Sequence, residues 1–399
     1  SSVLCFGFAL AEDYEQLALM RFLLGFVGAG FVIGIRMIGE WFPAKQTGIA
    51  QGIYGGWGNF GSAGGALILP SLALWYGGDD GWRWAIASTG VLTAIYSVVY
   101  FFSVTDTPKG STYFKPKKSG ALEVTSVGDL ILYLLMNIPL YAALAVLTWK
   151  LGPDNLGMLG SSVSYLIYAV LLGLYLFQTA RILQINLSLF SEEVPELERY
   201  SFRQVAALNL SYMVTFGSEL AIVSMLILFY QDTFTLSPVM AGLIASIFAG
   251  LNIIMRPAGG WISDNFGRKR SLGMIMSGLV VGYLMMSQID SSWSLSTAIL
   301  VTIFCSLFVN AGNGAVFAMI PLVKRRLTGQ IAGMTGAYGN VGAVTFLTVL
   351  SFVETELFFL LIAATAVVTL VAILLFLEEP KGSMAEVLPD GTVELIKVD

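Results

Sequence analysis

Long runs of apolar residues, separated by short polar segments, dominate the hydrophobic pattern of this chain. A helix that crosses a bilayer needs about 20 apolar residues in succession, and the chain supplies eleven such runs. The predicted spans are residues 17–40, 48–75, 84–104, 128–150, 161–184, 205–230, 237–262, 271–289, 294–320, 330–352 and 356–377. The pattern therefore predicts an all-α polytopic membrane protein.

Composition supports this class and excludes several chemistries. Of the 399 residues, 56% are hydrophobic and only 12% are charged, which is far too apolar for a soluble domain of this length. The chain has no histidine, and its two cysteines, Cys5 and Cys305, are isolated in apolar segments. We therefore expect no metal, no cofactor, no nucleic-acid partner and no enzymatic nucleophile with its base.

Charged residues alternate in sign from one connecting loop to the next. Cytoplasmic loops of membrane proteins retain Lys and Arg, so the basic loops are predicted to be cytoplasmic. The basic set comprises Lys45, Lys109, Lys115, Lys117, Lys118, Arg181, Arg199, Arg203, Arg268, Lys269, Arg270, Lys324, Arg325 and Arg326. The acidic set comprises residues 11–16, 76–81, 152–157, Asp232, Asp290, Glu354 and Glu356. This alternation predicts a multi-pass protein of the inner (plasma) membrane with a cytoplasmic C-terminus.

Two predicted helices share an internal repeat. The segment TGIAQGIYGGWGNFG begins at Thr47, and TGQIAGMTGAYGNVG begins at Thr328. At a constant offset they share several glycines, an aromatic residue and a Gly-Asn-x-Gly motif. Two parallel homologous halves are the plan of a major facilitator transporter, which implies two pseudo-symmetric helical halves.

Counting helices from this repeat gives a domain scheme. The two repeat helices become the fifth and eleventh of twelve, so residues 1–104 would hold the end of helix three and helices four to six. Helices one, two and most of three are expected to precede the chain. Residues 105–200 would connect the halves through two extra helices, residues 201–379 would form helices seven to twelve, and residues 380–399 a tail.

The paired Gly-Asn helices resemble those of the nitrate/nitrite porters of the major facilitator superfamily. Further segments share the resemblance, which is closest to the cyanobacterial-type nitrate permeases: GFVGAGFVIGIRMIGEWFP, YMVTFGSEL, MRPAGGWISD and AGNGAVFAMIPLV. A loop with Gly260, Asp264, Gly267 and Arg268 resembles the superfamily's signature loop, with Asn265 in place of the usual basic residue. In this loop the aspartate can accept backbone N–H bonds at a helix N-terminus.

Arg256 is the first candidate for substrate binding. It lies within the otherwise uncharged run IFAGLNIIMRPAGGWI, and a buried guanidinium needs an anionic partner. A carboxylate such as Glu219 is one candidate partner and the substrate is the other. The resemblance implies that this arginine binds substrate together with a second arginine from helix two, which lies outside the chain.

Other candidates surround the substrate in the resemblance. Tyr212 and Phe216 share a helix face, and Phe31 lies among small residues on another helix. Asn59 and Asn340 sit in mid-helix, where their amides either face the substrate across a central cavity or bond neighbouring helices. The glycines around them allow close helix packing and sliding; they include Gly55, Gly58, Gly61, Gly336, Gly339 and Gly342.

Two further charged positions complete the candidates. Glu219 is an intramembrane carboxylate and hence a candidate for proton coupling. Arg36 and Glu40 are four residues apart and are predicted to form a local ion pair.

The expected function is import of nitrate or nitrite by alternating access, coupled to protons. We expect a monomer in a lipid bilayer. Nitrate/nitrite exchange, transport of another anion or drug, and a non-transporting membrane sensor are the alternatives.

Overall fold

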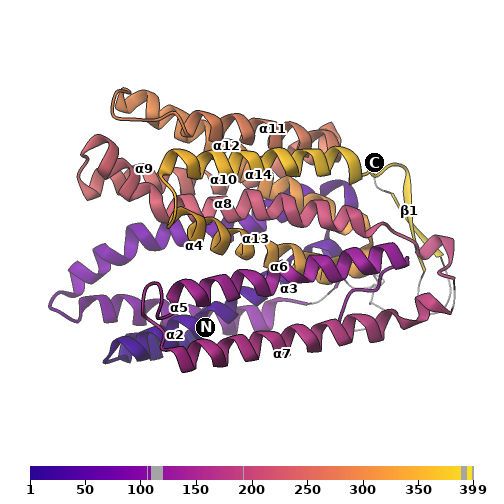
Figure 1. The fold of residues 1–399 in the computed structure, drawn as a ribbon, viewed down its shortest axis with the longest axis horizontal. Helices are drawn as coiled ribbons and strands as arrows, with labels where there is room; N and C mark the ends of the chain where they lie inside the picture. The colour runs from indigo at the N-terminus through magenta and orange to yellow at the C-terminus, as the bar shows by residue number, and fades with distance from the viewer. Residues whose placement is uncertain (106, 109–119, 192, 388–392, 398–399) are drawn as a thin grey trace.

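Helices make up almost the whole molecule (Figure 1). The computed structural model describes residues 1–105, 107–108, 120–191, 193–387 and 393–397. Its α-helices are α1 Ser2–Leu10, α2 Tyr14–Gly25, α3 Gly30–Trp41, α4 Thr47–Tyr76, α5 Gly81–Ser103, α6 Val127–Leu151, α7 Ser161–Asn186, α8 Phe202–Phe234, α9 Pro238–Gly250, α10 Asn252–Phe266, α11 Arg268–Met286, α12 Leu295–Val323, α13 Thr328–Leu350 and α14 Thr355–Phe376. Short 3-10 turns are η1 Phe26–Ala29, η2 Ala44–Gln46, η3 Leu187–Phe190, η4 Glu196–Glu198 and η5 Arg325–Leu327.

Local sequence signals set several helix ends. The hydroxyls of Ser126 and Ser294 accept hydrogen bonds from backbone N–H groups at the starts of α6 and α12, at 3.1 and 3.2 Å. The carboxylate of Asp13 accepts the backbone N–H of Gln16 at the start of α2, at 2.7 Å. Gly77 ends α4, and Gly267 separates α10 from α11; both have positive φ, a conformation that glycine adopts without steric cost.

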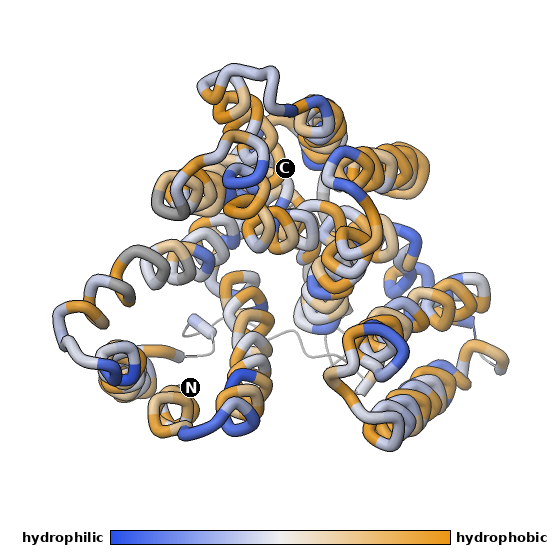
Figure 2. The backbone as a smooth tube through the Cα atoms, turned by 60° about the vertical axis from the view of Figure 1, so that its left-hand side comes forward, coloured by the Kyte–Doolittle hydropathy of each residue, from blue (hydrophilic) through white to orange (hydrophobic). Residues whose placement is uncertain are grey.

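All eleven predicted spans correspond to helical segments, and the all-α membrane fold is confirmed. Among the described residues, eight segments are long and apolar enough to cross a membrane. The other three predicted spans are α4, α11 and α13, of which α4 and α13 are rich in glycine and α11 starts with three basic residues. Figure 2 shows hydrophobic residues along most helices and hydrophilic residues near their ends.

Two spans predicted as continuous helices are interrupted. Residues 17–40 fall on α2, η1 and α3, where the glycines of GFVGAG flank the change in helix type. Residues 237–262 fall on α9 and α10, with a turn at Leu251 beside Gly250. Glycine lowers helix stability, which favours an interruption at these positions. The run of apolar residues continues through both interruptions, so the apolar pattern alone did not predict them.

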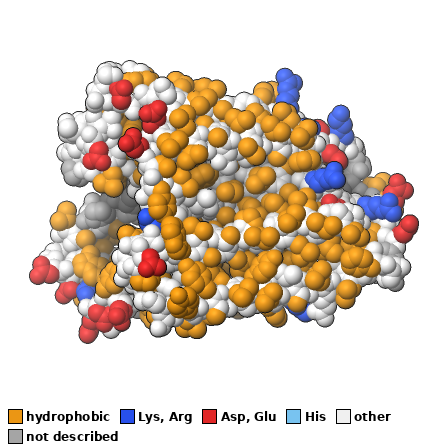
Figure 3. Space-filling view, in the orientation of Figure 1, with side chains coloured by type: hydrophobic (Ala, Val, Ile, Leu, Met, Phe, Trp, Pro, Cys, Tyr) orange, Lys and Arg blue, Asp and Glu red, His pale blue; other side chains and the backbone are white. Residues whose placement is uncertain are grey.

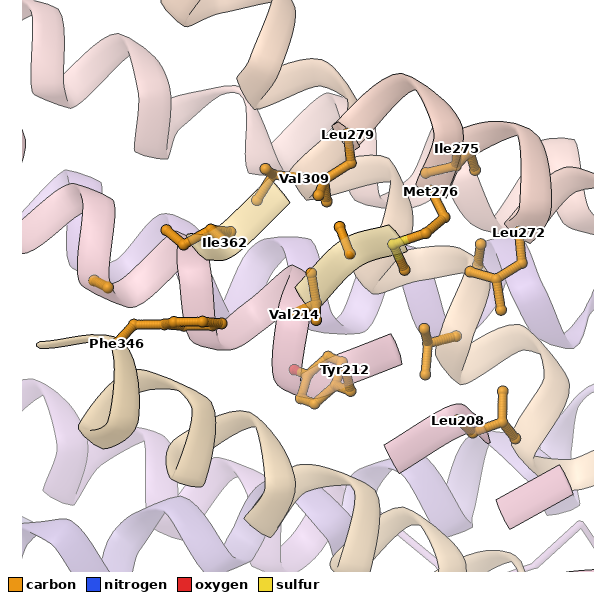
Figure 4. Packing of buried hydrophobic residues seen from close by; sticks show 14 of the residues in the cluster. Leu208, Tyr212, Val214, Leu272, Ile275, Met276, Leu279, Val309, Phe346 and Ile362 are labelled. Atoms are coloured by element: carbon orange, nitrogen blue, oxygen red, sulfur yellow. The ribbon is translucent and has the colours of Figure 1, made fainter. Parts of the chain in front are cut away.

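The buried hydrophobic core lies mainly in the second half of the chain. Figure 4 shows Val214, Leu279, Val309 and Ile362 among its side chains, contributed by α8, α11, α12 and α14. By contrast, none of the residues of α2 is buried. The helices α6 and α7 pack on each other, and α6 also packs on α8 and α13, so α6 connects this pair of helices to the second half.

One end of the molecule carries the basic loops together with a structure that the sequence did not predict. Lys and Arg side chains gather at the end that holds β1, and acidic side chains surround the opposite end (Figure 3). The predicted tail includes an antiparallel hairpin of β1 Ser383–Val387 and β2 Val393–Lys397. Ile396 packs against Ala44 of η2 and Leu322 of α12. This short hairpin lies in the tail, for which the sequence predicted no secondary structure, and it leaves the all-α class of the membrane domain unchanged.

The signature loop joins the two halves at this basic end. Both oxygens of Asp264 accept backbone N–H bonds at the start of α4, from Gly48 at 3.2 Å and from Ile49 at 2.9 Å. Arg268 pairs with Asp264 at 2.6 Å and donates to the carbonyl of Ala44 at 2.9 Å. The predicted capping role of Asp264 is confirmed, and the capped helix belongs to the other half.

Backbone strain at Gly267 gives a stability prediction. Its φ of +90° is costly for any residue with a Cβ, so Gly267→Ala should lower the free energy of unfolding by about 1 to 2 kcal/mol. Thermal unfolding in detergent micelles measures the change. Gly173→Ala in α7 is the control, because nothing lies within 4 Å of the added methyl; it should be neutral or slightly stabilising. Equal losses in both variants would contradict the strain argument.

Candidate functional site

Arg256 occupies the centre of the candidate site. It projects from α10 four residues after the helix begins, and only 1% of its surface is exposed. Its Nη2 donates to the hydroxyl of Tyr212 at 3.1 Å, while its buried Nε has no hydrogen-bond partner. No carboxylate of the described residues lies within ion-pair distance of it. A buried cation with an unused donor makes Arg256 a candidate site for a small anion.

Aromatic rings enclose the guanidinium. Its Cζ lies 5.5 Å from the ring centre of Phe31, 5.9 Å from that of Tyr212 and 5.7 Å from that of Phe317. Phe317 meets Phe31 and Tyr212 edge to face, and Phe216 stacks on Tyr212 with ring centres 4.9 Å apart. The rings come from α3, α8 and α12, so elements of both halves build this enclosure. Ring faces attract the cation and exclude water from it.

Glycines make room for this arginine. A Cβ added at Gly55 of α4 would lie 2.6 Å from Cζ and 2.9 Å from Nη2 of Arg256. A Cβ at Gly314 of α12 would lie 2.9 Å from the backbone carbon of Arg256. A Cβ at Gly52 would likewise lie too close to the backbone of Arg256 and Pro257. Close approach of α4 and α12 to α10 therefore depends on the absence of side chains at these positions.

Glu219 lies in a separate polar cluster beside the arginine. Its Oε1 accepts hydrogen bonds from the amides of Asn252 at 2.8 Å and Asn59 at 3.4 Å, and its Oε2 accepts one from Asn313 at 2.6 Å. The carboxylate is 4% exposed and has no cation within ion-pair distance in the described part of the chain. The alternative of a direct ion pair with Arg256 is therefore wrong for this structure, because amides take up both carboxylate oxygens.

The two repeat asparagines do not occupy equivalent places. Asn59 reaches the cluster around Glu219, whereas Asn340 is exposed and donates to the carbonyl of Gly336 in its own helix at 3.1 Å. The symmetric arrangement expected for the pair is not what the structure shows.

Arg36 and Glu40 form the predicted local ion pair at 3.1 Å.

The glycines named from the repeat also divide into two groups. Gly339 and Gly342 of α13 pack against α8: a Cβ at Gly339 would lie 2.7 Å from the ring of Phe216, and one at Gly342 would lie 3.0 Å from the Met213 backbone. At Gly58, Gly61 and Gly336 an added Cβ would meet nothing described within 4 Å. Helix packing therefore accounts for Gly55, Gly339 and Gly342, whereas for the other three the described residues show no packing contact and the predicted role stays a prediction.

Comparison with known proteins gives the family. The sequence profile of the Major Facilitator Superfamily matches residues 1–194 and 208–396. The nitrate/nitrite transporter NrtP of Nostoc punctiforme is 46% identical over 388 residues, which covers 96% of this chain and 78% of that protein. The NrtP of a Picosynechococcus species is also 46% identical and covers 97% and 80%. The chain belongs to the Major Facilitator Superfamily. These relatives place it in the nitrate/nitrite porter branch, as the sequence motifs predicted.

A solved structure supports the same fold. The proton:xylose symporter XylE, bound to a deoxyglucose derivative, superposes with a TM-score of 0.57 at 14% identity, over 95% of this chain and 79% of that one. Membership of this family of transporters confirms that the chain is a multi-pass membrane protein and not an enzyme.

Sequence reasoning missed three residues of the candidate site: Phe317, Asn252 and Asn313. Phe317 and Asn313 lie in the segment AGNGAVFAMIPLV, which the resemblance included without distinguishing its side chains. Asn252 begins α10, one turn before Arg256. The signal that could have revealed Asn252 and Asn313 was the same one used for Asn59, an amide in an apolar helix.

Two glycines three residues apart on α4 test the packing around Arg256. Gly55→Ala should displace the guanidinium and lower the free energy of unfolding by about 1 to 3 kcal/mol, as overpacking does. Gly58→Ala is the matched control and should be neutral or slightly stabilising, because its methyl meets no neighbour. Thermal unfolding in detergent micelles compares the two. If Gly55→Ala were as stable as the control, the close approach would be refuted.

Proposed function

We propose that this protein is a secondary active transporter that imports nitrate or nitrite by alternating access. The observation that carries the proposal is the buried Arg256, enclosed by aromatic rings and left with an unpartnered Nε. The names of the 46% identical relatives, both nitrate/nitrite transporters, support the same substrate class.

The geometry of the arginine suits a small planar anion. A guanidinium presents parallel N–H donors in one plane, and nitrate offers two oxygens at matching spacing. Phe31 and Phe317 keep water from the cation and limit the space beside it. The amide of Asn59, which donates to Glu219, lies at the edge of the same region. Tyr212 completes the set as a hydroxyl that already bonds the guanidinium.

Alternating access requires contacts between the halves that can form and break. We assign the moving bodies to residues 1–104 and 201–379, with residues 105–200 as their connection. At the basic end, Asp264 caps α4 and Arg36 donates to the carbonyl of Arg326 at 3.3 Å, and these contacts hold the two halves together there. Opening toward the other state must release these bonds. The basic loops and tail face the cytoplasm of a plasma-membrane monomer in this proposal.

Substitution of Arg256 tests substrate binding. Arg256→Lys keeps the charge but loses the planar pair of donors, so the apparent nitrate affinity should fall roughly tenfold or more. Uptake of isotopically labelled nitrate into proteoliposomes measures it. Arg203→Lys is the control, since Arg203 is exposed near the start of α8 and should transport normally. Unchanged affinity in Arg256→Lys would remove this arginine from the binding site.

We further propose that Glu219 carries the coupling proton. It is buried, bonded only by neutral amides, and one helical turn of α10 separates its partner Asn252 from Arg256. A carboxylate that neutralised Arg256 directly would favour simple nitrate/nitrite exchange. The separation of the two groups favours a carboxylate that can gain and lose a proton without breaking an ion pair.

Glu219→Gln separates the two coupling modes. The variant should lose the stimulation of nitrate uptake by an inward proton gradient, because the amide cannot titrate. Exchange of internal for external nitrate should persist, because Arg256 is untouched. Glu356→Gln, at an exposed carboxylate, is the control and should keep gradient-driven uptake. Full gradient stimulation in Glu219→Gln would exclude Glu219 as the proton site while leaving nitrate transport intact.

A further inference from the structure

A groove lies between α11 and α14 at the basic end of the molecule. Its volume is about 420 Å³, and the two helices pack side by side along it. Met274, Leu370 and Leu374 give it an apolar lining, and the side chains of Met274 and Leu374 are about half exposed. Because both helices are membrane spans, this apolar length faces the acyl region of the bilayer.

Two cations stand at the polar end of the groove. Lys269 donates from Nζ to the carbonyl of Leu374 at 2.9 Å, which places the ammonium across the groove from α11 to α14. Arg270 also lines the groove, is exposed, and has neither an ion pair nor a side-chain hydrogen bond among the described residues. Its guanidinium is therefore available to an anion.

One carboxylate, Glu379, also lines this end, but its oxygens already accept hydrogen bonds from the backbone at the start of α11. Its oxygens accept the backbone N–H groups of Arg268 at 2.5 Å and of Lys269 at 2.8 Å. A carboxylate bonded in this way serves the helix N-terminus. The neighbouring Arg268 pairs with Asp264, so Lys269 and Arg270 leave the groove with net positive charge.

Gly273 leaves the middle of the groove open. A Cβ at this position would meet nothing within 4 Å, although it lies on a packed helix between the cations and Met274. The polar end of the groove is therefore basic and continues into its apolar part, and the basic end lies at the level of the lipid headgroups.

We propose that this groove binds an anionic phospholipid from the leaflet at the basic end, with its phosphate between Lys269 and Arg270. An acyl chain would then follow Met274, Leu370 and Leu374. Basic pockets between membrane helices select anionic headgroups, because a cation near the membrane surface attracts them. The apolar part of this groove would hold the acyl chain. Free phosphate satisfies only the first of these requirements. Occupancy would hold the start of α11, where Arg268 contacts the other half.

The test uses the purified full chain in mixed micelles with phosphatidylglycerol or phosphatidylcholine. Lipid retention is counted by native mass spectrometry, and the thermal midpoint is followed against lipid concentration. The parent protein should retain phosphatidylglycerol preferentially and be stabilised by it. Arg270→Gln should weaken this apparent affinity about fivefold, the effect typical of one basic residue at a membrane surface. Gly273→Leu should abolish retention by filling the groove.

Arg203→Gln is the matched control, because it removes an exposed cation at the same end but outside the groove and should behave as the parent. Arg270 is exposed, so Arg270→Gln remains informative even if Gly273→Leu fails to fold. Equal phosphatidylglycerol retention by the parent, Arg270→Gln and Arg203→Gln would overturn the proposal. Stabilisation by inorganic phosphate equal to that by the lipid would overturn it as well.

Discussion

The cost of burying one guanidinium governs the centre of this protein. An arginine removed from water inside a membrane protein is unfavourable by several kcal/mol unless other groups replace its hydration. Around Arg256 the replacements are incomplete: one tyrosine hydroxyl and the faces of aromatic rings, with Nε left without a partner. Ring faces stabilise a cation without neutralising it. In the proposed function a transported anion would supply the remaining stabilisation, and the affinity of the site would come from a group that the protein itself leaves unsatisfied.

The same constraint explains the glycines. A long side chain can be buried at a crossing of helices only if neighbouring helices contribute little bulk there. Gly55 and Gly314 provide this space from α4 and α12, on two sides of Arg256. Gly339 does the same for the Tyr212 and Phe216 rings. Small residues also let packed helices shift against each other, which suits a site that must face each side of the membrane in turn.

The spans, the repeat and the two-half plan could be predicted because apolar length and paired motifs depend on local sequence. Arg256, Tyr212 and Phe31 could be named because charge and resemblance identified them, and the structure brings them together. The interruption at Leu251, the partners of Glu219 and the unequal places of Asn59 and Asn340 could not be predicted. These features depend on which helix faces pack against each other, and the periodicity of apolar residues does not determine that packing. The pairing of β1 with β2 was missed because these short strands lie outside the apolar runs on which the prediction of the spans depended.

The separation of Arg256 from Glu219 has a consequence for coupling. Each group keeps its own neutral partners, so binding of an anion at the arginine need not displace the carboxylate. The two sites would then communicate through the electric field, which is strong where water is excluded. An ionised Glu219 would repel an incoming anion, and a protonated Glu219 would not. By linkage, the anion would favour the protonated carboxyl by the same factor. Proton and anion would thus enter together because each lowers the electrostatic cost of the other, without any exchange of ion-pair partners.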